Sequence, residues 1–319
     1  MQRMKAIVEC QEDVAQGVRS FALRPASDSA EFEVAAAGSH VDLFLAQDLV
    51  RSYSLYLPAA KGDPYRIAVA LDPRSRGGSR HMFAHVKVGD EIDISLPKNH
   101  FPLTEDASNT VMVAGGIGVT PLMAMATRLT RLGKPWTLHY AAQARTSAAF
   151  INELQELAYA SGSSVHFSFG DDPDRQRIDL PKVFACAPLD THFYCCGPKR
   201  MIDAFVAAGE QRPSRFVHVE HFGGVTPTGS DQSFTVRLAR SGKVLTVPAG
   251  RTILEVVEQA GISVAHACKE GVCAACETRV IDGIPDHRDL VLSKKERGQN
   301  QSMMICCSGS VTAELVLDL

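Results

Sequence analysis

The segment His266-Ala267-Cys268-Lys269-Glu270-Gly271-Val272-Cys273-Ala274-Ala275-Cys276 decides how the C-terminal part of the chain folds. With Cys306 far downstream, its cysteines follow the C-x4-C-x2-C…C spacing of a plant-type [2Fe–2S] site. Small residues between the cysteines let the backbone approach such a cluster and direct N–H groups at its sulfurs. Zinc sites favour paired C-x2-C knuckles at closer separations, and buried free thiols would show no such spacing. The sequence therefore predicts a cluster whose ligands are Cys268, Cys273, Cys276 and Cys306.

The surrounding residues predict a small ferredoxin domain over 234–319. Residues 234–238 alternate as in a strand, and Gly242 leads into a second short strand at 244–247. Residues 253–260 show the spacing of apolar side chains that is typical of a helix, and they precede the cysteines. A hairpin, a helix, the cysteine segment and a late strand together predict a β-grasp (α+β) fold.

Two further domains are expected before a linker at 225–233, so the predicted fold class is multidomain. Residues 1–104 contain short alternating runs separated by turn residues, which predicts an antiparallel β-barrel. These runs are 32–34, 41–45, 66–70 and 91–96. Residues 105–224 alternate apolar strands with helices, which predicts a Rossmann-like α/β nucleotide domain. Its expected elements are strands at 111–114, 136–140 and 192–196 and a helix over 121–132.

The barrel region carries the motif Arg51-Ser52-Tyr53-Ser54-Leu55 on a predicted strand. Because side chains two residues apart share one face of a strand, Arg51 and Tyr53 can present a cation to a phosphate and a ring to a flavin. A companion segment, Arg74-Ser75-Arg76-Gly77-Gly78-Ser79, is typical of a phosphate cradle, where glycines expose N–H groups and Ser79 offers a hydroxyl. Each segment alone is also typical of solvated residues on a barrel.

The α/β region carries Gly115-Gly116-Ile117-Gly118-Val119-Thr120-Pro121 directly after an apolar strand. This turn is expected at the carboxyl end of the strand, where open α/β sheets bind nucleotides, although it is not the G-x-G-x-x-G fingerprint. Tyr194-Cys195-Cys196-Gly197-Pro198 ends another strand and puts Cys196 at the same edge. Close packing of the glycines and burial of a small thiol are simpler explanations of the two motifs.

The pair Asp171-Asp172 follows a predicted strand of the same sheet. Either carboxylate could accept a hydrogen bond from an adenosine ribose hydroxyl, and both would repel a 2′-phosphate. This interpretation favours NADH over NADPH. A solvated turn explains the two acids equally well.

Taken together, the motifs R-x-Y-S-L, G-G-S, G-G-I-G-V-T-P, C-G-P and the C-terminal cysteine spacing resemble the phthalate dioxygenase reductase family over essentially the whole chain. Members of that family are NADH-dependent iron–sulfur flavoproteins that reduce Rieske-type oxygenases, and the resemblance implies FMN rather than FAD. It implies that Arg51, Tyr53, Ser54 and Ser79 contact FMN, and Leu55, Gly77 and Gly78 of the same motifs are further candidate cofactor-binding residues. It implies that Gly116, Thr120, Cys196 and Gly197 border the nicotinamide. Gly118 and Pro198 of the same motifs, and Asp171, are further candidate residues for binding the nucleotide. Cys196 is expected to orient the nicotinamide.

Ala274 and the neighbouring residues Cys306 and Cys307 depart from the simple pattern of cluster ligands. Ala274 stands where the family more often has Gly, and its methyl group can change the hydrogen bonds to the cluster. Residues 303–307 look like a strand, in which neighbouring side chains face opposite ways, so only one of Cys306 and Cys307 can meet the cluster. The family pattern M-x-x-C-V-S implies that Cys306 is the ligand and Cys307 an apolar filler.

A nicotinamide gives up two electrons as hydride, whereas a [2Fe–2S] cluster accepts one at a time, so a flavin must stand between them. The resemblance thus predicts an oxidoreductase that passes electrons from NADH through FMN and the cluster to a Rieske-type aromatic-ring dioxygenase or demethylating monooxygenase. The alternatives are an FAD-containing reductase of a diiron monooxygenase, an iron–sulfur redox sensor and a zinc-stabilised binding module. Metal analysis and identification of the released flavin separate them.

Composition and charge argue against several kinds of partner and location for this protein. A net charge of −3 without any basic run argues against a nucleic-acid partner. The longest apolar stretch, 110–126, is interrupted by glycines and Pro121, so no membrane span is expected. No export signal is expected at the start, and nine cysteines in 319 residues are too few for a disulfide scaffold, which predicts a cytoplasmic protein. We expect a monomer, as is common for such reductases.

Overall fold

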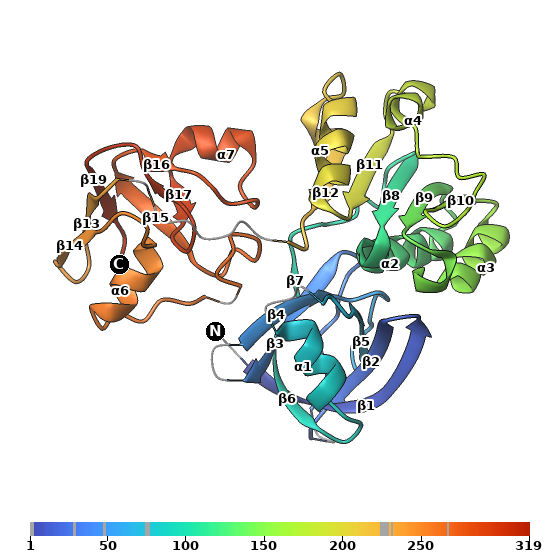
Figure 1. The fold of residues 1–319 in the computed structure, drawn as a ribbon, viewed down its shortest axis with the longest axis horizontal. Helices are drawn as coiled ribbons and strands as arrows, with labels where there is room; N and C mark the ends of the chain where they lie inside the picture. The colour runs from blue at the N-terminus through green and yellow to red at the C-terminus, as the bar shows by residue number, and fades with distance from the viewer. Residues whose placement is uncertain are drawn as a thin grey trace. The chain divides into compact units, whose positions relative to one another are not determined.

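The computed structural model describes residues 3–27, 30–46, 49–73, 77–223, 230, 232–266 and 268–319. The chain forms two compact units, Met1–Phe222 and Gly223–Leu319 (Figure 1). Most of the predicted linker, residues 225–229 and 231, lies outside the described residues. Within the described ranges, no helix is long and apolar enough to cross a membrane.

Antiparallel strands in the first part of the Met1–Phe222 unit form a barrel in the order β4-β3-β6-β1-β2-β5, with β7 paired to β3. They are β1 (Arg3–Ala15), β2 (Val18–Pro25), β3 (Ser39–Ala46), β4 (Leu49–Ser54), β5 (Tyr65–Ala70), β6 (Glu91–Ser95) and β7 (Lys98–Asn99). A bridge between Leu55 and Ile67 joins the end of β4 to β5, so the two edges of the sheet meet. Alternate side chains, such as Phe21 and Leu23, fill the interior. Helix α1 (Gly78–His85) packs beside β3, β4 and β5.

The strand predicted at 32–34 is wrong. Phe32 lies outside any strand, is fully buried, and stacks on the ring of Tyr65 with the centroids 4.1 Å apart. The apolar pattern there reflects the burial of one ring against the barrel rather than pairing in the sheet. The other three predicted runs lie in β3, β5 and β6, although β6 ends at Ser95.

The second part of this unit is a parallel sheet in the order β10-β9-β8-β11-β12. Its strands are β8 (Thr110–Gly115), β9 (Trp136–Ala142), β10 (Ser164–Phe169), β11 (His192–Cys196) and β12 (Val217–Glu220). Helices α2 (Val119–Arg131) and α3 (Ile151–Ser161) share one apolar core with the sheet, and α4 (Leu180–Cys186) and α5 (Lys199–Ala208) share another (Figure 1). The predicted helix over 121–132 therefore begins earlier, at Val119, and ends at Arg131.

The strand order reverses at β8, because the chain continues to β9 and β10 on one side and returns to β11 and β12 on the other. Open α/β sheets bind ligands at the carboxyl ends of the strands beside such a switch point. Cys196 at the end of β11 pairs with Ala114 near the end of β8. The fold thus brings the two predicted nucleotide motifs to one edge.

The Gly223–Leu319 unit is a mixed sheet in the order β14-β13-β19-β15-β17, with α6 (Ile253–Gln259) in its core. Its strands are β13 (Phe234–Leu238), β14 (Val244–Val247), β15 (Glu277–Asp282), β17 (Ser302–Met304) and β19 (Glu314–Leu317). A small pair is formed by β16 (Pro285–Asp286) and β18 (Gly309–Ser310), and α7 (Lys294–Gln299) precedes β17. Thr252 begins α6 with a capping box, because its hydroxyl accepts the N–H of Glu255 at 3.2 Å. This arrangement is the predicted β-grasp fold.

The strand predicted at 303–307 is too long. β17 ends at Met304, whose carbonyl oxygen accepts the N–H groups of Cys307 at 3.3 Å and Ser308 at 3.0 Å. These bonds close a turn, so Cys306 and Cys307 do not alternate as they would on a strand. Which of Cys306 and Cys307 is the cluster ligand must therefore be judged from the side chains that each thiol contacts.

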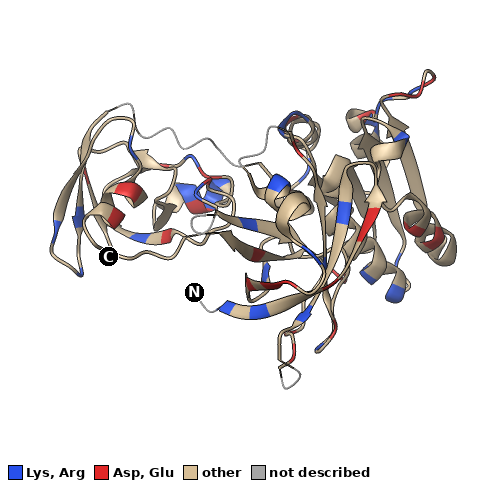
Figure 2. Cartoon of the chain, turned by 60° about the horizontal axis from the view of Figure 1, so that its bottom comes forward, with Lys and Arg blue, Asp and Glu red and all other residues tan. Residues whose placement is uncertain are grey.

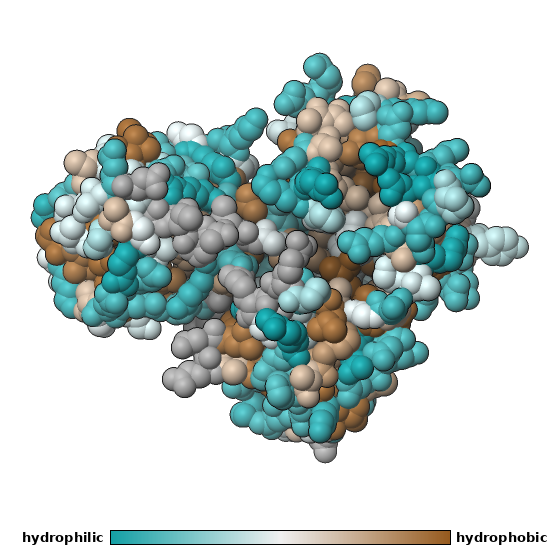
Figure 3. All heavy atoms as spheres, in the orientation of Figure 1, coloured by the Kyte–Doolittle hydropathy of each residue, from teal (hydrophilic) through white to brown (hydrophobic). Residues whose placement is uncertain are grey.

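The surface of both units is mixed in charge. In Figure 2, lysines and arginines are interspersed with aspartates and glutamates along each unit. The face drawn in Figure 3 is largely hydrophilic, with hydrophobic residues in small groups. Small groups of exposed apolar side chains are normal on a protein surface.

Candidate cofactor sites

Arg51 and the start of α1 form the phosphate end of the predicted flavin site. The side chain of Arg51, on β4, crosses Gly78, where a Cβ atom would lie 2.6 Å from Arg51 Cγ. Gly77 begins α1 with a φ of 95°, a left-handed conformation that favours glycine. A guanidinium group and the N–H groups of a helix N-terminus therefore lie near each other, which suits a phosphate. The 74–76 part of the predicted cradle lies outside the described residues.

Three other residues predicted to bind the flavin, Tyr53, Leu55 and Ser79, differ in how their side chains are buried and bonded. Tyr53 is half-buried with its ring against the barrel core, and burial raises the pKa of its phenol, which therefore stays neutral. Leu55 is 1% exposed and packs inside the barrel, so its side chain serves the core. The buried hydroxyl of Ser79 accepts the N–H of Asp72 at 3.2 Å. The aromatic ring of Tyr53 and the phosphate end together fit FMN.

The glycine turn after β8 packs directly against the turn after β11. A Cβ atom on Gly118 would lie 2.3 Å from Cys196 O, and one on Gly197 would lie 3.0 Å from Gly115 Cα. Gly116 has a φ of 56°, in the left-handed region. Such close approach excludes side chains at Gly118 and Gly197, whereas a Cβ atom on Gly116 would meet nothing within 4 Å, so Gly116 leaves open space at this edge of the sheet.

Thr120 and Pro198 hold these turns in place. Thr120 is 1% exposed, and its hydroxyl donates to Ile117 O at 3.0 Å within the glycine turn. Pro198 precedes α5 and packs on Gly115, where a Cβ atom would lie 2.5 Å from Pro198 Cδ. The hydroxyl of Thr120 is thus engaged by the turn itself, and Pro198 fixes the start of the helix.

Glu220 joins this site, although the sequence motifs did not single it out. It ends β12 and lies opposite Cys196 in the parallel pairing of β11 and β12. The hydroxyl of Ser54, from the barrel, donates to Glu220 Oε2 at 3.3 Å. The barrel and two strands of the parallel sheet therefore bring Ser54, Cys196 and Glu220 to one place.

Burial shifts the pKa values of two of these groups upward. Desolvation raises the pKa of Glu220 to about 8 and raises that of the Cys196 thiol well above its ordinary value. Glu220 is partly exposed as a residue, but its carboxyl group is enclosed by protein. Near neutral pH both groups hold their protons and can donate hydrogen bonds without the cost of a buried charge.

The two predicted ribose acids follow β10 at the same edge of the sheet. Both are exposed. Asp171 Oδ1 accepts the backbone N–H of Arg145 at 3.3 Å, and Asp172 Oδ1 accepts the N–H of Asp174 at 3.0 Å. Each carboxylate therefore bonds the loops that surround it.

The predicted cluster ligands are buried together in the Gly223–Leu319 unit. Cys268, Cys273, Cys276 and Cys306 are 9%, 3%, 3% and 1% exposed. The N–H of Glu270 donates to Cys268 Sγ at 3.3 Å, and that of Cys268 donates to Cys273 Sγ at 3.4 Å. Backbone N–H groups directed at sulfur stabilise the thiolates that hold an iron–sulfur cluster.

The four thiols lie as two contacting pairs. Cys268 contacts Cys273, and Cys276 contacts Cys306; the second contact raises the pKa of Cys276 and lowers that of Cys306. In the part of the chain that the structure describes, no three His, Cys, Asp or Glu side chains have the geometry for one metal ion. Two pairs suit a cluster of two irons, whereas zinc needs four ligands around a single point.

Gly271 and Ala274 shape the loop between the ligands, with φ values of 70° and 56°. A Cβ atom on Gly271 would lie 2.5 Å from Cys307 Sγ. Cys307 thus packs beneath the loop and against the thiol of Cys306, while Cys306 also contacts Cys276. The assignment of Cys306 as the ligand stays a prediction, which now depends on these contacts rather than on strand alternation.

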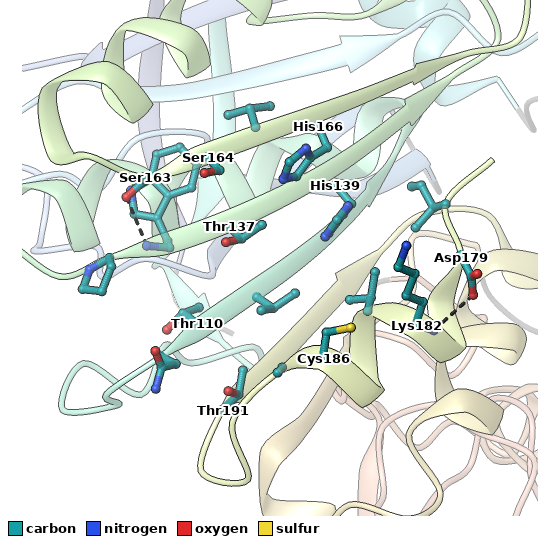
Figure 4. A pocket seen from close by; sticks show the side chains of 18 of the residues that line it. Thr110, Thr137, His139, Ser163, Ser164, His166, Asp179, Lys182, Cys186 and Thr191 are labelled. Atoms are coloured by element: carbon teal, nitrogen blue, oxygen red, sulfur yellow. Dashed lines mark hydrogen bonds between the residues drawn. The ribbon is translucent and has the colours of Figure 1, made fainter. Parts of the chain in front are cut away.

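A separate cavity of about 1010 Å³ lies on one face of the parallel sheet, over β9 and β10 and beside α4 (Figure 4). His139 and His166 stand side by side on neighbouring strands there, with ring centroids 4.9 Å apart. Desolvation lowers the pKa of His139 to about 4, so its ring is neutral near pH 7. No residue predicted to bind a cofactor lines this cavity, and we assign none to it.

Two family models match the chain. The oxidoreductase NAD-binding domain matches residues 112–207, and the 2Fe-2S iron-sulfur cluster binding domain matches residues 236–309. These matches define an NAD-dependent iron–sulfur oxidoreductase, and they confirm the predicted nucleotide and ferredoxin folds.

Similarity to known proteins extends over the whole length. The chain is 47% identical, over 96% of its length and 94% of the relative's, to a phenoxybenzoate dioxygenase subunit beta of Ectopseudomonas oleovorans. A solved structure of phthalate dioxygenase reductase is 35% identical, with a TM-score of 0.72 over 99% of this chain and 98% of that one. An intact type IV self-sufficient cytochrome P450 monooxygenase is 37% identical, with a TM-score of 0.89, and the match covers 99% of this chain but 41% of that one. This chain belongs to the phthalate dioxygenase reductase family. The two family models confirm the predicted NAD-type nucleotide and [2Fe–2S] cluster, and FMN stays a prediction.

Proposed function

We propose that this chain is the reductase component of a Rieske-type oxygenase system, whose oxygenase is an aromatic-ring dioxygenase or a demethylating monooxygenase. It takes hydride from NADH in the Met1–Phe222 unit and delivers single electrons through the Gly223–Leu319 unit. The observation that carries the proposal is the meeting of Ser54, Cys196 and Glu220 beside glycine turns at the switch point of the sheet.

The residues of the first unit bind and orient. FMN, when bound, supplies the step between a two-electron donor and a one-electron acceptor. Arg51 and the N–H groups at the start of α1 hold its phosphate, and Tyr53 places a ring against the flavin. The glycine turns border the nicotinamide, and Cys196, buried behind them and hydrogen-bonded to Glu220, holds these turns and the protonated Glu220 in place.

The residues of the second unit hold the cluster and exclude water from it. Cys268 and Cys273 take one iron, and Cys276 and Cys306 take the other. None of the nine cysteines forms a disulfide, and four of them are the proposed cluster ligands, which supports a reducing compartment and a cytoplasmic protein. We expect it to act as a monomer with NADH and the oxygenase as its partners, without nucleic acid or a membrane.

Flavin and metal analysis of the purified protein test this proposal. We expect a red-brown protein with about one FMN and about two irons per chain, the content of a [2Fe–2S] flavoprotein. With NADH it should reduce a purified Rieske oxygenase encoded beside its gene. FAD released by acid would favour the reductase of a diiron monooxygenase, and a single zinc in place of iron would rule out electron transfer through the thiols.

A further inference from the structure

Asp289 is buried against the loop that carries three of the predicted cluster ligands. It lies between β16 and α7 (Figure 1), and its side chain is 0% exposed. Its Cα atom lies 3.0 Å from the position of a Cβ atom added to Gly271, and the N–H of Leu290 donates to Gly271 O at 2.8 Å. Among the described residues of the Gly223–Leu319 unit, Asp289 is the one charged side chain that is buried. The fold therefore keeps an acid against the cluster loop, although the burial of a charge is costly.

The carboxylate of Asp289 organises the chain that follows it. Its Oδ2 accepts the N–H groups of Val291 at 3.0 Å and Leu292 at 2.7 Å. Its Oδ1 has no hydrogen-bond partner among the described residues, and His287 Nδ1 lies 3.8 Å away. The two backbone bonds are typical of a carboxylate that stabilises a turn. They leave half of a buried carboxylate unpaired, however, which is unfavourable for a residue that serves only the turn.

Arg297, on α7, supplies only a loose countercharge to Asp289. Its Nη2 lies 3.7 Å from Asp289 Oδ2, and the hydrogen bond that this nitrogen donates goes to the backbone carbonyl oxygen of Asp289. The side chain of Arg297 is 34% exposed, whereas that of Asp289 is 0% exposed. Water screens an exposed cation more than a buried anion. The pair therefore leaves a negative field around the carboxylate.

The charge of Asp289 acts on the thiols at the cluster site. Cys307 Sγ lies 2.5 Å from the position of a Cβ atom on Gly271, the same glycine against which Asp289 packs. Contact with Cys306 raises the pKa of the Cys307 thiol most, burial raises it further, and the charge of Asp289 adds to the rise. Cys306, the predicted ligand, contacts Cys307 directly. The field of Asp289 is therefore felt one side chain away from a ligand of the cluster.

We propose that the buried charge of Asp289 lowers the reduction potential of the [2Fe–2S] cluster and that Arg297 limits this effect. The inference rests on the proposed function, because it takes the four predicted thiols as the ligands of the cluster. Reduction adds one electron, and hence one negative charge, to the cluster, and a neighbouring anion opposes that addition. The electron comes from the reduced flavin and passes to the oxygenase, and Asp289 neither gains nor loses one. A lower potential makes the reduced cluster a stronger electron donor.

A redox titration of the holoenzyme tests the proposal, with the reduced cluster followed by its electron paramagnetic resonance signal. Asp289→Asn removes the charge but keeps an oxygen that can accept the N–H groups of Val291 and Leu292. It should favour the reduced cluster about tenfold, which is a rise of about 59 mV for one electron. Arg297→Gln removes the countercharge and should lower the potential instead. Because the carboxylate is buried, the shift in Asp289→Asn should persist at high ionic strength.

Asp286→Asn is the matched control in the same segment. Asp286 Oδ2 is paired with Arg288 Nη2 at 2.6 Å, and its side chain is 37% exposed, so water screens its charge. This variant should change the equilibrium between oxidised and reduced cluster less than about twofold. The iron content and visible spectrum of each variant show whether the cluster is retained.

The outcomes separate the inference from the proposed function. An unchanged potential in Asp289→Asn with full iron content overturns the inference, since Asp289 would then serve the turn alone. Shifts of the same sign in Asp289→Asn and Arg297→Gln overturn it too, because they indicate a distorted loop rather than a charge effect.

Arg297→Gln decides the question if Asp289→Asn does not retain the cluster. A fall in the potential of Arg297→Gln then supports the inference, and an unchanged potential overturns it. Wild-type protein without iron contradicts the proposed function itself. Iron in the wild type with potentials that do not move leaves that function standing.

Discussion

Glu220 is the residue whose chemistry depends most on its surroundings. Desolvation raises its pKa from 4.5 to about 8, so its carboxyl group is neutral near pH 7. Above that pKa, a buried carboxylate would oppose the negative charge that hydride brings to the site. We therefore expect the rate of flavin reduction by NADH to fall as pH rises through about 8. Stopped-flow measurements on both sides of that pH give the profile.

Glu220→Gln is the matched variant, because glutamine keeps the shape and cannot ionise. Its rate should be flat where the wild-type rate falls. Stability gives a second readout: the folded protein keeps this proton up to about pH 8, whereas the unfolded chain loses it near 4.5. The contribution of Glu220 to the free energy of unfolding therefore decreases as pH rises through that interval. A decline above pH 8 that persists in the glutamine variant would assign it to another group.

Cys306 and Cys307 are adjacent, both buried and chemically identical, and their thiols contact each other, yet their other contacts differ. The Cys306 thiol meets Cys276, whereas the Cys307 thiol packs under Gly271. Cys306→Ser should abolish or severely destabilise the cluster and leave FMN bound, because an iron loses its thiolate. Cys307→Ser, the matched control, should keep the visible spectrum near wild type. The reverse pattern in iron content would show that the ligand is Cys307.

At the scale of elements, Gly271 and Ala274 in the loop between the cluster ligands both have a left-handed backbone conformation. Gly271 adopts it without strain, whereas Ala274 does so at a cost in free energy. Ala274 has a φ of 56°, where a side chain costs about 1 kcal/mol. We expect Ala274→Gly to stabilise the loop by up to about this amount, partly offset by greater freedom of the unfolded chain. Thermal loss of the cluster absorbance measures it.

Gly271→Ala is the opposite variant in the same loop. Gly271 also has a positive φ, of 70°, and an added Cβ would lie 2.5 Å from Cys307 Sγ. Strain and a clash then act together, and this variant should lose the cluster at a lower temperature than wild type. If Ala274→Gly also lowered that temperature, the methyl group of Ala274 would have a packing role that outweighs its backbone strain.

The sequence predicted those elements whose signal is local. Apolar alternation identified β3, β5 and β6, and glycine turns after apolar strands identified the edge of the parallel sheet. Phe32 was misjudged because one buried ring gives the same pattern as a strand. The turn after Met304 could not be predicted, because it is formed by backbone hydrogen bonds, and these do not depend on the pattern of side chains.

Glu220 was missed for a different reason. Its partner Ser54 is 166 residues away in the chain, so only the fold makes them neighbours. The alternation in Val217-His218-Val219-Glu220 signals a strand, but an acid at its end is typical of solvent-facing residues. Cys196 carried a motif, and its role next to a protonated carboxyl group could be inferred only from the pairing of β11 with β12.

At the scale of the whole molecule, the two units have separate apolar cores and separate chemistry. A fragment that ends after Phe222 keeps the barrel, the parallel sheet and the residues proposed to bind FMN and NADH. It should fold on its own and reduce ferricyanide with NADH at a rate near that of the full chain. It should reduce cytochrome c far more slowly, because the cluster that passes on single electrons is absent.

The full-length Cys306→Ser variant is the control for the fragment, because it should lack the cluster but keep the Gly223–Leu319 unit. This variant keeps both units but should lack the cluster, so it should behave like the fragment with both acceptors. Equal rates of cytochrome c reduction in the fragment, the variant and the wild type would mean that electrons leave directly from the flavin. If only the fragment lost cytochrome c reduction, the Gly223–Leu319 unit would contribute a docking surface rather than an electron path. We expect the fragment and the Cys306→Ser variant to reduce cytochrome c equally slowly and the wild type to reduce it much faster. That result would mean that electrons leave the protein through the cluster held by the thiols, and that the surface of the Gly223–Leu319 unit alone is not enough.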